Sequence, residues 1–421
     1  MDAFRAVVLH GARQSGKTTL ARQLTDARGG TYLTLDDDAI REAALADPDT
    51  LITSHRFPLA IDEFQLGGDR LVRAIKRAVD IDPVPGRFLL TGSTNFLTLP
   101  TMSESLAGRV RILRLWPFSE AELSGVPSSL DRWFDTVPTS AQAGRLTRND
   151  YLELTCRGGY PEVIGLGVEA RRAWVDSYVE TVTQRDIAAL ADIRKTSALP
   201  RLIRWVAANT SSEINIANAA RDLGINRATI TSYLEWLETV FLVYQIPVWS
   251  RKLETRAVRR PKLHLGDTGL AAQLLTTSAT ALAAPTAPAT GSLLESFVVN
   301  EISRQLVTSK TGISLSHYRD NHGREVDLVL ERADGATIAI EIKTTTSPTR
   351  KQAKHLAWFR DRLDAVAPGA FRGGILLHTG HQSATVGDRL HLLPIDTLWA
   401  SPIGPSDAPE PGVTRHQSDD R

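Results

Sequence analysis

The chain has 421 residues, with 49 Lys or Arg against 48 Asp or Glu, so its formal net charge is +1. This length exceeds one typical hydrophobic core and suits two or three domains. The balanced charge excludes a global field that would draw the whole molecule to nucleic acid or a membrane. Any such contact would need a local patch.

Cysteine content and hydropathy predict the compartment. Cys156 is the single cysteine, so no intramolecular disulfide framework can form, and no Cys/His cluster has the spacing of a zinc site. The apolar run at residues 6–9 is too short for a signal peptide, and no segment is long enough to span a bilayer. We therefore expect a soluble, cytoplasmic protein with no membrane contact.

The first part of the sequence predicts an α/β domain with a parallel sheet. Residues 4–9 resemble a short buried strand that runs into a glycine-rich turn, and residues 18–27 have the apolar spacing of a helix. Further strand signals alternate with helical stretches such as residues 70–80, which favours helices on both faces of the sheet. These strands are expected at residues 31–35, 59–61, 87–91 and 112–115.

From about residue 151 the pattern becomes helical. Long helical stretches are expected at residues 169–192 and 199–210. Residues 217–223 and 227–238 then form a helix-turn-helix pattern in which Asn226 is a good N-cap, and the apolar run 241–248 is a candidate wing. A helical domain with a winged-helix module follows from this pattern.

The last part of the sequence predicts a second α/β domain. Residues 276–290 are nearly all Ala, Thr, Ser, Pro and Leu, and we expect a flexible connector there. A helix at 293–307 and strands at 314–318, 325–331 and 337–343 follow, and the Pro/Ser/Asp-rich end should be disordered. The expected units are residues 1–125, 150–275 and 291–400 with a tail at 401–421.

One motif points directly to phosphate chemistry. Residues 11–18 fit the GxxxxGK[ST] pattern at every fixed position and lie between an expected strand and an expected helix. In such a loop the backbone N–H groups converge, the helix N-terminus adds positive potential, Lys17 reaches the β and γ phosphates, and Thr18 binds Mg²⁺. The nucleotide-binding residues are Gly11, Ala12, Arg13, Gln14, Ser15, Gly16, Lys17, Thr18 and Thr19.

Two consecutive carboxylates, Asp62 and Glu63, follow the expected strand at residues 59–61. The carboxyl edge of a parallel sheet is where such a domain binds its ligand. Asp62 would hold the hydrated Mg²⁺, and Glu63 would orient and deprotonate the attacking water. Seen without a neighbouring P-loop, paired acids after a strand would indicate only an ordinary turn.

Three further residues complete the predicted ATP site. Ser93 and Asn95 follow the strand at 87–91, where they could sense the γ-phosphate, although a polar turn explains them equally well. Arg109 is a candidate arginine finger, acting in cis or from a neighbouring subunit, and the alternative is an ordinary surface arginine.

Several short motifs resemble one family of bacterial and archaeal AAA-type ATPases that carry a C-terminal domain of unknown function. The resemblance covers nearly the whole chain up to about residue 400, and it implies an AAA-like core, a winged-helix segment and a C-terminal fold like that of PD-(D/E)xK nucleases. Besides the P-loop, it is carried by residues 35–38, 61–65, 90–93, 158–162, 184–187, 261–262, 267–270 and 325–327.

A second constellation lies near the C-terminus. Asp327 and Glu341 sit on two expected strands joined by a three-residue loop centred on Asp334, which would place them opposite each other. Lys343 shares the face of Glu341 and completes a D…ExK arrangement, with Glu295 as a further acid. These acids could hold Mg²⁺ for phosphodiester cleavage. The alternative is a solvated hairpin in which Glu341 and Lys343 balance their charges.

The densest basic patch follows the candidate wing. It is the preferred phosphate contact if the protein binds DNA, against the alternative of a solvated loop. The helix at 227–238 is a poor reader of the major groove because it also carries Glu235 and Glu238. The patch comprises Arg251, Lys252, Arg256, Arg259, Arg260 and Lys262.

The sequence therefore predicts a Mg-dependent ATPase whose nucleotide cycle controls the helical module and a nuclease-like C-terminal domain, acting on DNA. The competing hypothesis is a nucleotide-controlled switch in which the last domain binds a partner and cleaves nothing. Neither the oligomeric state nor the physiological substrate follows from these patterns.

Overall fold

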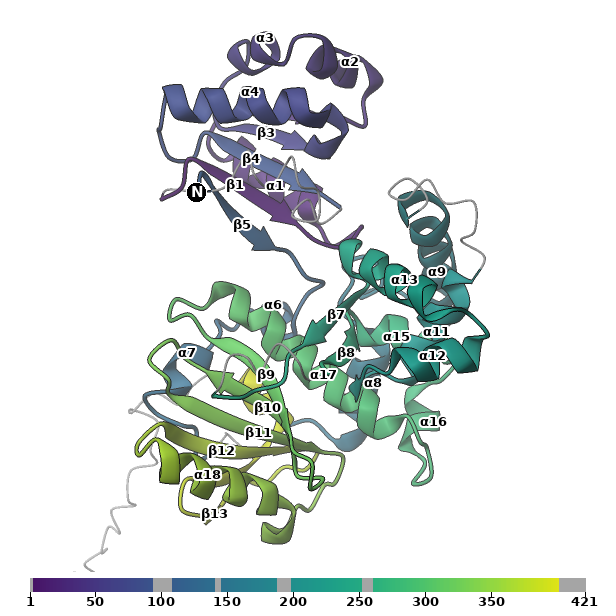
Figure 1. Cartoon of the computed structure of the whole chain (residues 1–421), viewed down its shortest axis with the longest axis vertical. Helices are drawn as coiled ribbons and strands as arrows, with labels where there is room; N and C mark the ends of the chain where they lie inside the picture. The colour runs from purple at the N-terminus through teal and green to yellow at the C-terminus, as the bar shows by residue number, and fades with distance from the viewer. Residues whose placement is uncertain (1–2, 94–107, 141–144, 188–197, 252–259, 401–421) are drawn as a thin grey trace, which may run out of the picture.

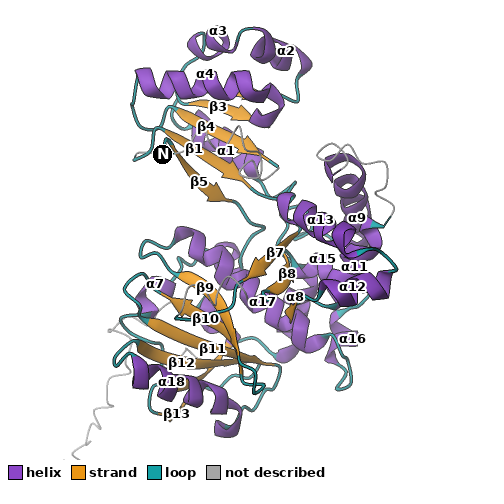
Figure 2. Ribbon diagram, viewed as in Figure 1, coloured by secondary structure: helices purple, strands orange, loops and turns teal. Residues whose placement is uncertain are grey.

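The computed structural model describes residues 3–93, 108–140, 145–187, 198–251 and 260–400. Figure 1 shows a sheet domain formed by the N-terminal part at one end of the molecule and a second sheet domain formed by the C-terminal part at the other. A largely helical module lies beside the junction of the two, and the ribbon coloured by secondary structure makes the alternation clear (Figure 2). Asn95, Lys252, Arg256, Arg259 and the tail at 401–421 lie outside the described residues.

The N-terminal sheet has five parallel strands in the order β2-β3-β4-β1-β5. The central strands are wholly buried, as continuous apolar runs in a doubly covered parallel sheet should be. The expected parallel α/β domain is therefore confirmed. The strands are β1 (Ala6–His10), β2 (Thr31–Thr34), β3 (Leu59–Asp62), β4 (Phe88–Gly92) and β5 (Val110–Arg114).

Helices cover both faces of this sheet. One face packs against α1 (Lys17–Asp26) through Ala21, and the other packs against α4 (Gly68–Ile81) through an apolar stripe that includes Leu71 and Ile75. Helices α2 (Asp38–Ala46) and α3 (Pro48–Thr53) and the turn η1 (Phe64–Gly67) complete the second layer.

The segment after β5 crosses to the C-terminal domain. Helix α6 (Glu120–Leu123) begins at a capping box on Ser119, and α7 (Leu130–Trp133) follows. Leu130 and Trp133 are buried in the same core as the C-terminal sheet. The chain therefore contributes to the far domain before it enters the helical module.

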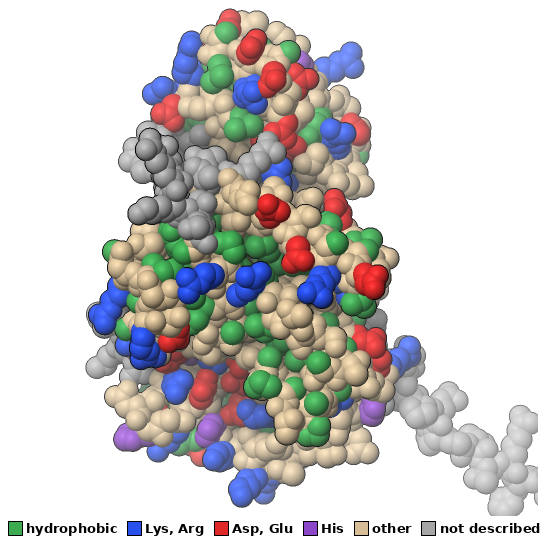
Figure 3. Space-filling model, turned by 90° about the vertical axis from the view of Figure 1, so that its right-hand side faces the viewer, with side chains coloured by type: hydrophobic (Ala, Val, Ile, Leu, Met, Phe, Trp, Pro, Cys, Tyr) green, Lys and Arg blue, Asp and Glu red, His purple; other side chains and the backbone are tan. Residues whose placement is uncertain are grey.

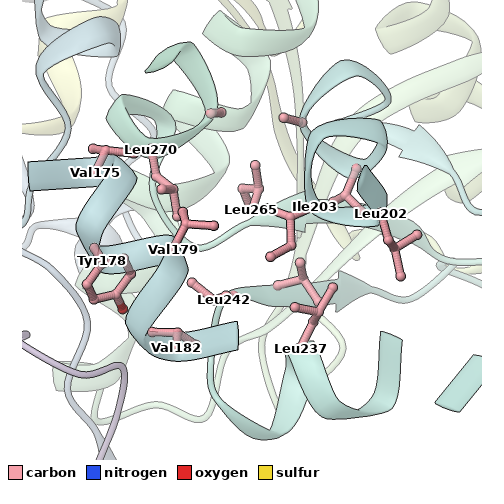
Figure 4. Close-up of a cluster of buried hydrophobic side chains, with 14 of the residues drawn as sticks. Val175, Tyr178, Val179, Val182, Leu202, Ile203, Leu237, Leu242, Leu265 and Leu270 are labelled. Atoms are coloured by element: carbon pink, nitrogen blue, oxygen red, sulfur yellow. The ribbon is translucent and has the colours of Figure 1, made fainter. Parts of the chain in front are cut away.

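The helical module has one core, part of which Figure 4 shows, with side chains from α9, α11, α13 and α15 meeting at its centre. The module is all-helical apart from a small sheet. Its helices are α8 (Arg148–Arg157), α9 (Val168–Thr181) continued by the π-helical turn η3 (Val182–Asp186), α11 (Leu199–Ala208), α12 (Ile216–Leu223), α13 (Arg227–Thr239), α15 (Thr268–Leu274) and α16 (Ala279–Ala283).

The expected helix-turn-helix is present. The Asn226 side chain accepts a hydrogen bond from the Thr229 backbone N–H and caps α13, while Leu223 and Leu234 are buried. The apolar run after α13 forms β7 (Val243–Ile246), which pairs antiparallel with β8 (Lys262–Leu265), and β6 (Ser212–Glu213) lies on the other side of β8.

The Ala/Thr/Pro-rich stretch differs from the flexible connector expected from its composition. It contains α16, and Leu282 on that helix is buried in the core of the helical module. The Arg148 guanidinium donates hydrogen bonds to the carbonyl oxygens of Leu282 and Ala283, and the Thr290 hydroxyl donates to the Leu282 carbonyl oxygen. One buried leucine and three hydrogen bonds fix a segment that composition alone marks as a linker.

The C-terminal domain is a six-stranded mixed sheet in the order β13-β14-β12-β11-β10-β9. Helix α17 (Thr290–Gln305) packs on one face and α18 (Lys354–Val366) on the other. The strands are β9 (Ser314–Arg319), β10 (Glu325–Glu331), β11 (Thr337–Lys343), β12 (Phe371–His378), β13 (Ala384–Gly387) and β14 (Leu390–Pro394), and the short turns are η4 (Leu306–Thr308), η5 (Arg350–Ala353) and η6 (Ile395–Leu398). Within the described residues, no helix combines the length and apolar character needed to cross a membrane.

Candidate functional site

The glycine-rich loop lies between β1 and α1, at the carboxyl edge of the N-terminal sheet. Gly16 is the N-cap of α1 and has a φ of 95°, a left-handed conformation that residues with a side chain rarely adopt. The positive φ at Gln14 makes the loop curl just before the helix begins. The loop therefore presents its backbone at a helix N-terminus, as binding of a phosphate requires.

Two side chains of the loop are buried with their polar atoms directed inward. Lys17 Nζ donates hydrogen bonds to the carbonyl oxygens of Gly11 at 3.0 Å and Ala12 at 2.8 Å. The Ser15 hydroxyl is buried and has no hydrogen-bond partner among the described residues. An ammonium that folds back on its own loop and an unsatisfied hydroxyl both fit a loop built around an anionic ligand.

Asp62 ends β3 and gathers three hydroxyl groups around one buried carboxylate. Thr18 donates to Asp62 Oδ2 at 2.8 Å, Tyr32 donates to the same oxygen at 2.6 Å, and Thr91 donates to Oδ1. Burial, together with the hydrogen bond to Asp62, raises the pKa of Tyr32 to about 12. The two side chains that the sequence assigned to Mg²⁺, Thr18 and Asp62, are thus in direct contact.

Glu63 directly follows β3 and has a φ of 52°, which is uncommon for a residue with a side chain. Its Oε2 accepts hydrogen bonds from the Ser93 backbone N–H at 3.3 Å, from the Ser93 hydroxyl at 3.2 Å and from the Gln65 amide. The carboxylate is therefore tied to the end of the neighbouring strand β4, where the sequence had placed Ser93.

Arg109 lies away from this cluster. It precedes β5, and the register of β5 with β1 pairs Val110 with Ala6, so Arg109 is at the amino edge of the sheet, opposite the P-loop. Its guanidinium forms a two-point ion pair with Asp80, at 2.6 and 3.1 Å. An arginine finger acting in cis would have to lie at the carboxyl edge, beside the P-loop, and Arg109 does not. A contribution from a neighbouring subunit stays a prediction.

Arg109→Ala is therefore expected to leave ATP hydrolysis by dilute protein unchanged within about twofold, since the side chain is on the wrong edge of its own sheet. Steady-state phosphate release at several protein concentrations would check this. A loss of about a hundredfold or more that appears only when the protein is concentrated would instead support action on a neighbouring subunit.

A different arginine, which the sequence analysis did not single out, lies at the carboxyl edge. Arg114 ends β5 and is paired in register with His10 at the end of β1. Its guanidinium lies 3.4 Å from the ring centre of Trp116, and burial lowers its pKa to about 10. Burial, with smaller effects of Arg114 and Lys17, lowers the pKa of His10 to about 4, so this edge carries positive charge beside a neutral imidazole.

The helical module contacts the P-loop directly. The ring of Pro161 lies 3.9 Å from the position that a Cβ atom would take on Gly16. The Tyr178 hydroxyl donates to the Arg13 carbonyl oxygen at 3.3 Å and shares a 2.9 Å hydrogen bond with the Tyr160 hydroxyl. Trp174 stacks on Tyr178 with ring centres 4.9 Å apart. A displacement of the loop would therefore disturb these contacts with α9.

The C-terminal constellation is also brought together. The β10–β11 register pairs Leu328 with Ile340, and continuing it by one residue puts Asp327 opposite Glu341. Lys343 Nζ lies 3.5 Å from Glu341 and 4.0 Å from Asp327. Burial raises the pKa of Glu341 to about 7, and burial with the Asp327 charge also raises the pKa of Glu295 on α17.

Lys262 lies inside this acidic cluster, whereas the sequence placed it in an exposed basic patch. Only 2% of the residue is exposed, and its Nζ is 2.7 Å from both Glu295 and Glu325. Burial alone would lower the pKa of Lys262, but the surrounding carboxylates raise it above its usual value. Among the described residues, no group of three or more His, Cys, Asp or Glu side chains is arranged to hold a metal ion. Lys262 is therefore not the exposed phosphate contact that the sequence predicted. Its ammonium lies instead among the acids where the metal site was expected.

The remaining described members of the basic patch, Arg251 and Arg260, are exposed. Arg260 lines a small hollow with Glu213, Arg319 and Asp320, so its surroundings carry both signs of charge. Figure 3 likewise shows acidic and basic side chains mixed over the face that it views. Arg260 is therefore flanked by acidic as well as basic side chains.

The fold and the loop define a P-loop nucleotide-binding domain of the AAA class. Residues 3–124 match a family model described as an AAA domain, residues 148–281 match a domain of unknown function, DUF8612, and residues 290–398 match another, DUF4143. The chain thus carries an AAA domain at its N-terminus followed by two domains to which no function is assigned. The AAA domain implies nucleotide binding, typically with Mg²⁺.

Two relatives are described as uncharacterized proteins. An uncharacterized protein of Mycobacterium tuberculosis is 29% identical over 371 residues, covering 87% of this chain and 77% of the relative. An uncharacterized protein of Haemophilus influenzae is 23% identical over 285 residues, covering 62% of this chain and 67% of the relative. Among solved structures, the RuvB Holliday junction branch migration motor of Thermotoga maritima is 17% identical, with a TM-score of 0.27 over 58% of this chain and 82% of that chain.

Proposed function

We propose that this protein binds ATP with Mg²⁺ at residues 11–19 and hydrolyses it, and that the nucleotide state is passed to the helical module. The observation that carries the proposal is the convergence of Lys17, the Thr18–Asp62 pair and Glu63 at one edge of one parallel sheet. Phosphoryl transfer depends on positioning and charge stabilisation, which these groups are able to supply.

Each residue has one task in this proposal. Lys17 would exchange its bonds to loop carbonyl oxygens for phosphate oxygens, and the buried Ser15 hydroxyl would gain a partner. Thr18 and Asp62 would hold the metal ion, which when bound neutralises charge on the phosphates. Glu63, held by Ser93, would accept a proton from the attacking water.

The contact between the P-loop and α9 supports the second half of the proposal. Tyr178→Phe removes only the hydroxyl that donates to the Arg13 carbonyl oxygen, and we expect it to change the ATP dissociation constant by about threefold to tenfold, the effect of one hydrogen bond of roughly 1 kcal/mol. Titration with a fluorescent ATP analogue would measure this. Tyr151→Phe is the matched control, because it removes a buried hydroxyl bonded to Asp396 in the far domain. Equal affinities for all three proteins would contradict the coupling.

The sequence also suggested that the protein acts on DNA. Measuring ATP hydrolysis and DNA cutting with a plasmid or a single strand present would test this. We expect Mg²⁺-dependent hydrolysis that a plasmid or a single strand changes by less than about twofold, with no cutting, because Lys262 fills the acidic cluster and Arg260 lies beside acidic side chains. Such a result fits a nucleotide-controlled switch. Stimulation by DNA together with Mg²⁺-dependent cutting that Asp327→Ala abolishes would establish the nuclease reading instead.

A further inference from the structure

The acidic cluster of the C-terminal domain contains a cation that belongs to the protein itself. Lys262 Nζ is 2.7 Å from Glu295, 2.7 Å from Glu325 and 3.8 Å from Asp327, and only 3% of its side chain is exposed. A lysine is rarely buried this deeply unless its charge is paired, and here three carboxylates surround it. The contacts therefore form one ion-pair network.

The lysine and the acids come from different domains. Glu295 is on α17, and Glu325 and Asp327 are on β10 of the C-terminal sheet, whereas Lys262 begins β8 in the small sheet of the helical module. This sheet is attached to the edge strand β9 of the C-terminal sheet. The Trp249 N–H donates to the His317 carbonyl oxygen at 2.6 Å, and the His317 N–H donates to the Pro247 carbonyl oxygen at 2.9 Å. The Lys262 ammonium therefore links the helical module to the C-terminal domain.

The positions of the oxygen atoms explain why the cluster does not fit a metal ion in this arrangement. Asp327 Oδ2 accepts the Ile342 backbone N–H at 2.8 Å, and Oδ1 faces the Lys262 ammonium. Glu341 is 2% exposed, and its Oε1 accepts no hydrogen bond from the described residues. Carboxylate oxygens are ligands that a hard divalent cation prefers, but here the Lys262 charge, with Lys343 Nζ 4.0 Å from Asp327, repels such an ion.

We propose that Lys262 is the built-in cation of the Glu295/Glu325/Asp327 cluster, that it excludes divalent metal ions, and that the cluster becomes a divalent-cation site when Lys262 is removed. In the parent protein, the ion pairs of Lys262 hold the helical module against the C-terminal domain. The proposal does not depend on hydrolysis at the P-loop, so each of the two can fail without the other.

Mn²⁺ binding to the full chain without nucleotide tests the proposal. Lys262→Met keeps the length and apolar stem of the side chain and removes its charge. Electron paramagnetic resonance or calorimetric titration should show that this variant gains one Mn²⁺ site at least about tenfold tighter than any Mn²⁺ site in the parent, because Glu295, Glu325 and Asp327 then lack the Lys262 charge. Mn²⁺ should also raise the melting temperature of Lys262→Met but not of the parent. The gained site should be absent from Lys262→Met/Asp327→Asn.

A second variant covers the case in which Lys262→Met does not fold. Lys262→Met/Glu295→Gln removes one charge of each sign and retains Glu325 and Asp327, so it should fold and still gain the Mn²⁺ site. The proposal is overturned if the parent binds Mn²⁺ at Asp327 as tightly as the variants do, or if neither variant gains a site.

Discussion

Glu63→Gln is expected to lower kcat for ATP hydrolysis by about 10²–10⁴-fold while the ATP dissociation constant changes by less than about threefold. The amide retains the size of the side chain and can still contact Ser93, but it cannot accept a proton from water. Phosphate release and binding of a fluorescent ATP analogue, measured on the same preparation, would separate the two effects. Glu63 lies beyond the loop that binds the phosphates, so its loss should be confined to the chemical step.

Lys17→Ala should be measured beside Glu63→Gln, because it is expected to affect ATP binding as well as catalysis. Its ammonium is buried in the P-loop, and removing it should weaken ATP binding and also lower kcat/KM by at least about a hundredfold, since it acts on the phosphates before and during transfer. Arg73→Ala removes an exposed cation from α4 in the same domain and serves as the control. If Glu63→Gln hydrolysed ATP at the parent rate while Lys17→Ala did not, the P-loop would stand and Asp62 or another group would have to supply the base.

The parts of this protein that could be predicted from the sequence are those fixed by local patterns. Short apolar runs gave the strands of the parallel sheet, and the glycine-rich motif lies where its strand and helix context placed it. The hairpin register that brings Asp327 opposite Glu341 follows from two alternating strands joined at Asp334. In each case neighbours in the sequence determine the geometry.

Long-range packing decided the rest. Nothing in the pattern around Lys262 separates it from the exposed arginines nearby, because its partners are on α17 and β10. Arg109 and Arg114 lie at opposite ends of one strand, so only the register with β1 tells which of them approaches the P-loop. Composition likewise marks α16 as a linker, although Leu282 anchors it.

The motifs around residues 158–162 and 267–270 have a structural role that their spacing could not reveal. Asp267 is 1% exposed, caps α15 by accepting the Leu270 N–H, and accepts the Gly159 N–H at 2.7 Å. Arg304 of α17 donates to Asp267 and also to the carbonyl oxygens of Phe118 and Gly266. Gly158 has a φ of 74°, and a Cβ there would lie 2.1 Å from Asp267 Oδ1. One buried ion pair therefore joins the segment after β5, the helical module and α17.

Asp267→Ala is expected to lower the free energy of unfolding by about 3–5 kcal/mol, because it leaves the Arg304 charge buried without a carboxylate to balance it. Urea unfolding followed by circular dichroism would measure the midpoint of the transition that includes the helical module. Asp361→Ala is the matched control: its carboxylate pairs with Arg360 on the surface with 68% of the side chain exposed, and its loss should cost no more than about 0.5 kcal/mol.

The double variant Asp267→Ala/Arg304→Met distinguishes a charge effect from lost packing. If most of the cost comes from the unpaired guanidinium, the double variant should be less destabilised than the sum of the two single variants by about 1–3 kcal/mol. Strict additivity would mean that Asp267 and Arg304 act independently, through the cap of α15 and the carbonyl oxygens of the crossing segment. A coupling of that size would instead show that the Asp267–Arg304 ion pair itself holds together the segment after β5, the helical module and α17.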